Sequence, residues 1–186
     1  MYKKRHILLA MMLFTLGVAL GALGSISLPL GLGVTGFWPA IVVQVVGAIW
    51  LGVLGVFTGA VFPFISNTYA GGAPLVVSFL YLPSNTVQGL IPYLAFKYLG
   101  LDPSLRDLRS LIHFLWSGVF VNNALGALLA TFMVMISGLR LYTDPYIFAR
   151  TWFFGNVIPM LFIGIPTLWF ISPLLEKTGI IPRRAS

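Results

Sequence analysis

Residues 38–65 read WPAIVVQVVGAIWLGVLGVFTGAVFPFI and contain no charged side chain. The uncharged stretch extends in both directions, because no Asp, Glu, Lys, Arg or His occurs between Ile7 and Phe96. Charged residues make up roughly 25% of an ordinary soluble domain, whereas they make up 8% of this 186-residue chain. A soluble fold could not cover its wet surface with so few. The sequence therefore predicts an integral membrane protein with no room for a separate soluble catalytic domain.

The apolar segments between turn-forming residues set the number of membrane spans, since a spanning helix needs about 20 apolar residues. We predict an all-α protein in the cell membrane: one transmembrane domain over residues 1–186, folded as a six-helix bundle with both termini cytoplasmic. The predicted spans cover about residues 7–30, 38–51, 53–65, 75–99, 111–139 and 146–175. A cleaved signal peptide ending near Ala22-Leu23-Gly24 is the alternative for the first span, although its apolar core exceeds the usual 7 to 15 residues.

Glycines decide how residues 38–65 fold, because Gly47, Gly52, Gly55 and Gly59 interrupt the run. We predict two short helices joined by a tight turn at residues 50–54, with a single long tilted helix as the alternative. Six spans gather most basic residues on one side, which the positive-inside rule makes cytoplasmic; five spans would largely remove this asymmetry. That side receives Lys3, Lys4, Arg5, Lys97, Arg106, Arg109, Lys177, Arg183 and Arg184, and leaves Arg140 and Arg150 outside.

Two connections carry turn signals. Residues 66–74 (SNTYAGGAP) have the Asn, Gly and Pro content of a turn. Residues 99–110 (LGLDPSLRDLRS) form the only clearly water-facing stretch inside the chain. Asp102 as N-cap and Pro103 as first helical residue predict that the next helix begins there.

The residue content excludes several classes of function. No Cys occurs, so disulfides, thiolate metal sites and cysteine nucleophiles are absent. The predicted spans hold no mid-membrane carboxylate, which argues against an ion-coupled pump and leaves no acid pair or metal cluster for an enzyme. We therefore expect no catalytic residue, cofactor or metal. The net charge of +7 sits between apolar segments, where it meets lipid headgroups rather than nucleic acid.

Polar and aromatic side chains within the spans share a band in the outer half of the predicted bundle. Such a band suits a pocket that holds a small polar molecule through amide hydrogen bonds and aromatic contacts, with an arginine for a carboxylate or phosphate. The alternative is that the amides only join helices and the aromatic residues form an interfacial belt. The candidate substrate-binding residues are Trp38, Gln44, Tyr81, Asn85, Asn122, Asn123, Arg150 and Asn156.

Small residues recur at four-residue spacing in the first span, at Gly17, Gly21 and Ser25, and Ala10 precedes them. Small residues at this spacing let helices approach closely. Internal packing is the default interpretation, and a docking surface for a partner protein is the alternative.

Residues 36–65 (GFWPAIVVQVVGAIWLGVLGVFTGAVFPFI) and 152–177 (WFFGNVIPMLFIGIPTLWFISPLLEK) resemble the substrate-binding S components of energy-coupling factor (ECF) transporters. The resemblance implies a six-helix protein that captures a vitamin or related micronutrient from outside. It also implies partners: a transmembrane T component and two cytoplasmic ATPases. The usual docking motif of that family is an Ala-x3-Ala pair, where this chain has Ala10-x3-Phe14. Residues 152–156 are also similar to the last helix of integral membrane sensor domains.

The sequence thus leads to two hypotheses of different class. The first is a membrane substrate-binding subunit of an ECF-type transporter, supported by the span layout, the polar band and the lack of coupling carboxylates. The second is a non-transporting scaffold or sensor subunit of a larger membrane complex.

Overall fold

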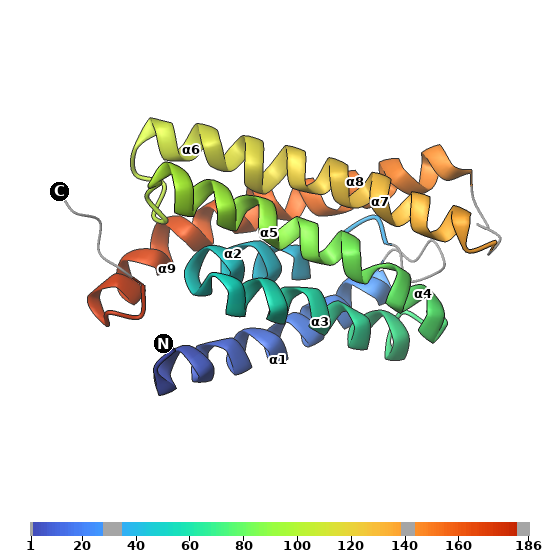
Figure 1. The fold of residues 1–186 in the computed structure, drawn as a ribbon, viewed down its shortest axis with the longest axis horizontal. Coiled ribbons are helices and arrows are strands. Elements are labelled where there is room, and N and C mark those ends of the chain that lie inside the picture. The colour runs from blue at the N-terminus through green and yellow to red at the C-terminus, as the bar shows by residue number, and fades with distance from the viewer. Residues whose placement is uncertain (1, 28–34, 139–143, 182–186) are drawn as a thin grey trace.

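The computed structural model describes residues 2–27, 35–138 and 144–181, and most of these residues are helical. Within these ranges six helical segments run back and forth along an elongated bundle (Figure 1). The first segment is a single unbroken helix, the second and third meet at a tight turn, and the other three are interrupted. The elements are α1 (Lys4–Ser27), α2 (Ala40–Leu51), α3 (Val53–Tyr69), α4 (Leu75–Leu80), α5 (Leu82–Leu99), α6 (Leu108–Phe114), η1 (Leu115–Val121), α7 (Asn122–Ile136), α8 (Pro145–Pro159), η2 (Met160–Gly164) and α9 (Ile165–Lys177).

The start of α1 and the end of α9 lie at the same end of the bundle, which we call the termini end (Figure 1). Arg5 Nη1 donates a hydrogen bond of 2.7 Å to the Thr178 carbonyl oxygen, and His6 Nε2 lies 3.0 Å from the Ile180 carbonyl oxygen. Tyr2 also reaches the turn between α2 and α3, where its hydroxyl lies 3.1 Å from the Leu51 carbonyl oxygen. The α2–α3 turn is therefore at this end too. Residues 100–107 also lie here, since the Pro103 carbonyl oxygen accepts from Ser172 Oγ of α9 at 2.9 Å.

Three helical segments of the described chain are long and apolar enough to cross a membrane: Lys4–Ser25, Leu108–Ile136 and Pro145–Lys177. Their lengths of 22, 29 and 33 residues exceed or match the need of about 20. The apolar helices α2 and α3 are shorter, and the segment from Leu75 to Leu99 is interrupted at Tyr81. These helices identify a membrane protein.

The run from Trp38 to Ile65 folds as two helices, in agreement with the predicted hairpin and not with one long helix. Gly52 lies between α2 and α3 with φ of +61°, a left-handed value that a residue with a Cβ adopts only with strain. A Cβ at Gly55 would lie 1.9 Å from the Gly47 carbonyl oxygen. The two glycines therefore let the backbones of α2 and α3 touch, and α2 becomes the buried centre of the bundle.

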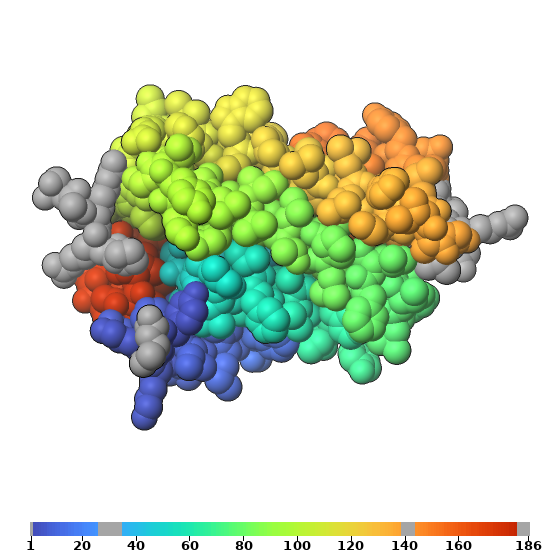
Figure 2. Space-filling model, in the orientation of Figure 1, coloured from blue at the N-terminus to red at the C-terminus, as the bar shows by residue number. Residues whose placement is uncertain are grey.

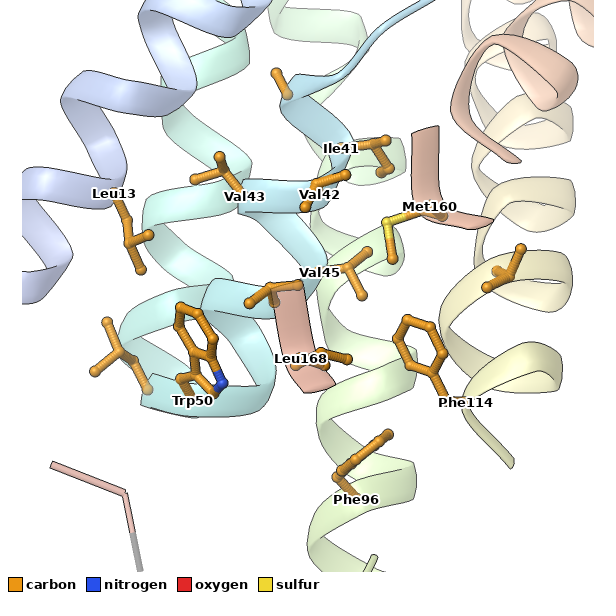
Figure 3. Packing of buried hydrophobic residues seen from close by; sticks show 14 of the residues in the cluster. Leu13, Ile41, Val42, Val43, Val45, Trp50, Phe96, Phe114, Met160 and Leu168 are labelled. Atoms are coloured by element: carbon orange, nitrogen blue, oxygen red, sulfur yellow. The ribbon is translucent and has the colours of Figure 1, made fainter. Parts of the chain in front are cut away.

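The core surrounds α2, whose Ile41 and Val45 are fully buried. Figure 3 shows Val45 between Met160, Leu168 and Phe114, which come from the last two helical segments. In the space-filling view, α4 and α5 fill the surface between α3 and α7 (Figure 2). Large apolar side chains on the outer faces, such as Phe57 and Phe162, remain exposed, as expected for helices that meet lipid.

Two predicted boundaries are wrong. The third helix extends past Ile65 to Tyr69 and holds Pro63 in its interior, so the turn before Leu75 is shorter than predicted. The helix after residue 99 begins at Leu108 with Asp107 as its N-cap, whose side chain accepts from Ser110 N. Asp102 cannot cap that helix because Leu105 has a φ of +53°, which ends any helical run from Pro103.

Some predicted features lie outside the described residues. These are the ends of the spans at 28–30 and 139, most of the connection at 25–36, and Arg140, Arg183 and Arg184.

Candidate functional site

A stripe of buried polar groups follows the segment formed by α4 and α5. Tyr81, Asn85 and Gln88 are spaced at i, i+4 and i+7, which places them on one helical face. Ser84 borders this face, and each of the four side chains is at most 1% exposed. At 1.5 Å of rise per residue, the stripe is about 10 Å long. The sequence thus carries a polar ladder into the interior of an apolar bundle.

Amide side chains from both sides of α5 meet the middle of this stripe. From α2, Gln44 Nε2 donates to the Asn85 carbonyl oxygen. From α7, Asn122 Nδ2 donates to the Gln88 carbonyl oxygen at 3.1 Å, while Gln88 Nε2 donates to Asn123 Oδ1 at 2.7 Å. We call this set the amide cluster; it consists of Gln44, Ser84, Asn85, Gln88, Asn122 and Asn123.

The π-helical segment η1 ends immediately before Asn122 and Asn123. Such segments are rare and occur often at functional sites. The Val119 carbonyl oxygen in η1 accepts a hydrogen bond of 2.8 Å from Asn123 Nδ2. Both adjacent amides are fully buried, and both are held by backbone carbonyls at the same depth as Gln88.

Every member of the amide cluster except Asn123 has a buried polar atom with no hydrogen-bond partner among the described residues. Buried polar groups are almost always hydrogen-bonded, and each exception needs an explanation. An unpaired group costs about 1–3 kcal/mol, so a set of five around one turn of α5 marks a candidate binding site. The unpaired atoms are Gln44 Oε1, Ser84 Oγ, Asn85 Nδ2, Gln88 Oε1 and Asn122 Oδ1.

An aromatic cluster lies one turn beyond Asn85, further from the termini end. The rings of Tyr81 and Trp152 are 4.9 Å apart edge to face, and Phe148 lies 6.4 Å from Tyr81 and 6.1 Å from Trp152. These side chains from α8 pack on Ala127, Ala130 and Val134 of α7. The Trp152 Nε1 atom is buried and unpaired, so this cluster offers ring faces and one free N–H donor.

Trp38 joins the same region through α8. Its backbone N–H donates to the Gly155 carbonyl oxygen at 2.9 Å, and a Cβ at Gly155 would lie 2.5 Å from the Thr35 carbonyl oxygen. The absent side chain lets residues 35–38 lie against α8, next to the buried Asn156. Trp38 Nε1 is a second buried, unpaired indole donor.

The predicted site residues therefore fall into three groups. Gln44, Asn85, Asn122 and Asn123 belong to the amide cluster, and Trp38, Tyr81 and Asn156 belong to the region around α8. Arg150 is apart from both groups, since its side chain is exposed and lies 5.9 Å from the ring of Tyr146. The described geometry gives it no contact with the buried polar groups.

The residues predicted for partner docking lie on the inward face of α1. Ala10, Gly17 and Gly21 are all buried. A Cβ at Gly17 would lie 2.7 Å from the Phe62 ring, and one at Gly21 would lie 2.5 Å from Ser66 Oγ. The two glycines receive α3, as the internal-packing interpretation expects, and Ala10 belongs to the buried core. Phe62 in turn stacks on Trp38 at 6.1 Å, so α1 helps to position that residue.

Sequence reasoning left three members out of the candidate site: Ser84, Gln88 and Trp152. Gln88 could have been found from its spacing of seven residues after Tyr81 and three after Asn85. The unpaired state of Ser84 and Trp152 depends on the neighbouring helices, and no sequence pattern indicates it.

Other features offer less chemistry. A groove of about 370 Å³ between α5 and α7 is lined only by the apolar residues Val87, Leu125, Leu128, Leu129 and Phe132. Among the described residues, no three His, Cys, Asp or Glu side chains come together as a metal site would require. The amide cluster and the aromatic region thus form the candidate site, and its groups can bind but offer no activated nucleophile.

Comparison of the chain with protein-family models, with curated proteins and with solved structures gives no match.

Proposed function

We propose that this chain is a multi-pass cell-membrane protein that binds a small polar molecule between its helices, as the substrate-binding subunit of an ECF-type transporter. The observation that carries the proposal is the set of five unpaired polar atoms around α5. Amides that only joined helices would use both their donors and their acceptors, because unpaired groups are costly in a medium without water. Gln44, Gln88 and Asn122 each use only their donor side.

The direction of access follows from the position of the two clusters. With the termini end in the cytoplasm, as the basic residues suggest, the aromatic cluster lies toward the outside and the amide cluster lies near the middle. A molecule entering from outside would meet Tyr81 and Trp152 first. This order fits a capture subunit, whose energy would come from a separate T component and ATPase pair.

Ligand binding can be measured on the full chain in lipid nanodiscs. We expect at least one member of a panel of vitamins and nucleobase-like compounds to raise the melting temperature saturably, since a ligand at 100 times its Kd adds about 2.7 kcal/mol of stability. Asn122→Leu should abolish the effect. Thr86→Val is the matched control, because among the described residues the Thr86 hydroxyl bonds only the Leu82 carbonyl oxygen of its own helix.

Two outcomes would overturn the proposal. One is the absence of saturable binding across the panel together with normal cellular uptake in Asn122→Leu. The other is recovery of the native protein in a stable membrane complex without any ATPase, which would favour the scaffold or sensor alternative.

A further inference from the structure

The orientation of the buried amides in the amide cluster is fixed by backbone carbonyls. A carbonyl oxygen only accepts hydrogen bonds, so an amide beside it must present its NH₂ group. Gln44 faces the Asn85 carbonyl in this way, and Asn122 faces the Gln88 carbonyl. Neither side chain can rotate by 180° without placing two oxygens together.

Gln88 is fixed through one intermediate residue. Asn123 Nδ2 is held by the Val119 carbonyl oxygen at 2.8 Å, so Asn123 must direct its Oδ1 at Gln88. Gln88 must then present Nε2, as it does at 2.7 Å. The free atom of Gln88 is consequently its carbonyl oxygen.

The cluster therefore presents three fixed acceptors: Gln44 Oε1, Gln88 Oε1 and Asn122 Oδ1. The two remaining groups can adapt. The Ser84 hydroxyl can donate or accept, and within the described residues nothing anchors the Asn85 amide, whose Nδ2 is unpaired. A molecule that binds this cluster must supply N–H or O–H donors to these oxygens.

The distribution of charged residues narrows the class of ligand further. No Asp, Glu, Lys, Arg or His occurs between Ile7 and Phe96 or between Phe114 and Leu139. Lys97 in the last turn of α5 is exposed, so the buried parts of the helices that build the cluster supply no group to neutralise a bound ion. Three carbonyl oxygens repel a carboxylate or phosphate, and a charge buried without a counter-charge is costly. The unpaired indole donor of Trp152, whose ring contacts Tyr81 one turn from Asn85, suits an acceptor atom of the same molecule and disfavours a cation.

We propose that the site takes an uncharged, flat molecule with an N–H edge and excludes carboxylates and phosphates. This inference rests on the proposed binding function. Each N–H donor of that edge pairs with one of the three acceptors, Gln44 Oε1, Gln88 Oε1 and Asn122 Oδ1. The ring lies toward Tyr81 and Trp152, whose faces accept planar groups. Arg150 takes no part, since it is exposed.

Matched probes test this class on the full chain in nanodiscs of neutral lipid. The first set is uracil, 1,3-dimethyluracil, which lacks N–H donors, and orotate, which adds a carboxylate to the same ring. The second set is nicotinamide, N,N-dimethylnicotinamide and nicotinate. We expect uracil or nicotinamide to bind at least about tenfold more tightly than its two analogues, because each analogue leaves a buried acceptor unpaired or buries a charge.

Variants connect the selectivity to the cluster. Gln44→Met and Asn122→Leu should each weaken binding of the preferred probe by about tenfold or more, while Thr86→Val should not. The melting temperature without probe reports whether each variant folds, and Asn85→Ala provides a smaller change if either one does not.

The outcomes separate this inference from the function on which it rests. Equal or tighter binding of orotate, nicotinate or a dimethylated probe would overturn the ligand class and leave a binding protein. A saturable rise in melting temperature with NaCl, but not with choline chloride at equal ionic strength, would also overturn it in favour of an ion site. No binding by any probe or by the wider panel would overturn both.

Discussion

Two buried polar clusters in this protein differ in how completely their atoms are paired. At the termini end, the Asp102 carboxylate accepts from Ser104 N and from Ser104 Oγ at 2.8 and 2.7 Å, and Asp102 N donates to Ser110 Oγ at 2.8 Å. Ser172 Oγ accepts from Trp50 Nε1 at 2.8 Å and donates to the Pro103 carbonyl oxygen at 2.9 Å. We call this set the loop cluster; its side chains are those of Trp50, Asp102, Ser104, Ser110 and Ser172. Within the described chain none of its side-chain atoms is unpaired, whereas the amide cluster has five unpaired atoms.

The contrast matters because both clusters belong to one chain and both are buried. The loop cluster shows that this fold pairs polar groups fully where they hold the structure together. The tryptophan side chains differ in the same way: Trp50 Nε1 in the loop cluster is hydrogen-bonded, whereas Trp38 Nε1 and Trp152 Nε1 are not. Unpaired atoms are therefore concentrated around α5, which has five of the nine found among the described residues; the other four are Arg5 Nε, Trp38 Nε1, Asn67 Oδ1 and Trp152 Nε1. This concentration supports a binding role for the amide cluster.

The largest effect should follow Asp102→Ala. The substitution leaves two buried donors of Ser104 without an acceptor, so we expect a loss of about 3 kcal/mol in the free energy of unfolding. Asp144→Ala is the matched control, because that exposed carboxylate caps α8 by accepting from Tyr146 N and should cost about 1 kcal/mol. Unfolding in detergent, followed by tryptophan fluorescence, measures both. Equal losses of unfolding free energy would mean that the buried hydrogen bonds of Asp102 stabilise the protein no more than the exposed cap of Asp144 does.

Ser172→Ala should have the next largest effect, about 2 kcal/mol, because it leaves Trp50 Nε1 and the Pro103 carbonyl oxygen unpaired. This hydroxyl joins α2, α9 and the loop of residues 100–107, so its loss should also weaken their packing. The melting temperature of the ligand-free protein is the measurement. A change below about 0.5 kcal/mol would show that the pairing in the loop cluster contributes little to stability.

The sequence predicts the helices better than it predicts either cluster. The turn at Gly52 follows from glycine spacing, and the helical segments follow from apolar length. The helix is capped by Asp107 and not by the predicted Asp102, because Leu105 takes a positive φ. No local sequence pattern requires that φ. Likewise, Gln44 can be recognised as a buried amide, but which of its atoms is free depends on the carbonyl of Asn85 on another helix. That information exists only once the helices have packed.

A smaller effect distinguishes two asparagines inside the amide cluster. Asn123→Ala removes a side chain that both accepts from Gln88 and donates to Val119, so it should cost about 2 kcal/mol. Asn85→Ala removes an unpaired Nδ2 and should cost less than about 1 kcal/mol, since only packing is lost. In the probe titration, by contrast, Asn85→Ala should weaken binding although it scarcely changes stability. If Asn85→Ala were the more destabilising of the two, the amide cluster would be a structural network.

The smallest effect should follow Ser84→Ala, which makes the same substitution in the amide cluster as Ser172→Ala makes in the loop cluster. Both serines are fully buried, but the Ser84 hydroxyl is unpaired, so its removal ends a desolvation cost and breaks no bond. We expect the free energy of unfolding to remain within about 0.5 kcal/mol of wild type, or to rise slightly, because replacing an unsatisfied polar group by an apolar one is nearly neutral or stabilising. A loss as large as that of Ser172→Ala would show that Ser84 is paired in the membrane by water, and the difference between the two clusters would then be one of hydration and not of a missing ligand.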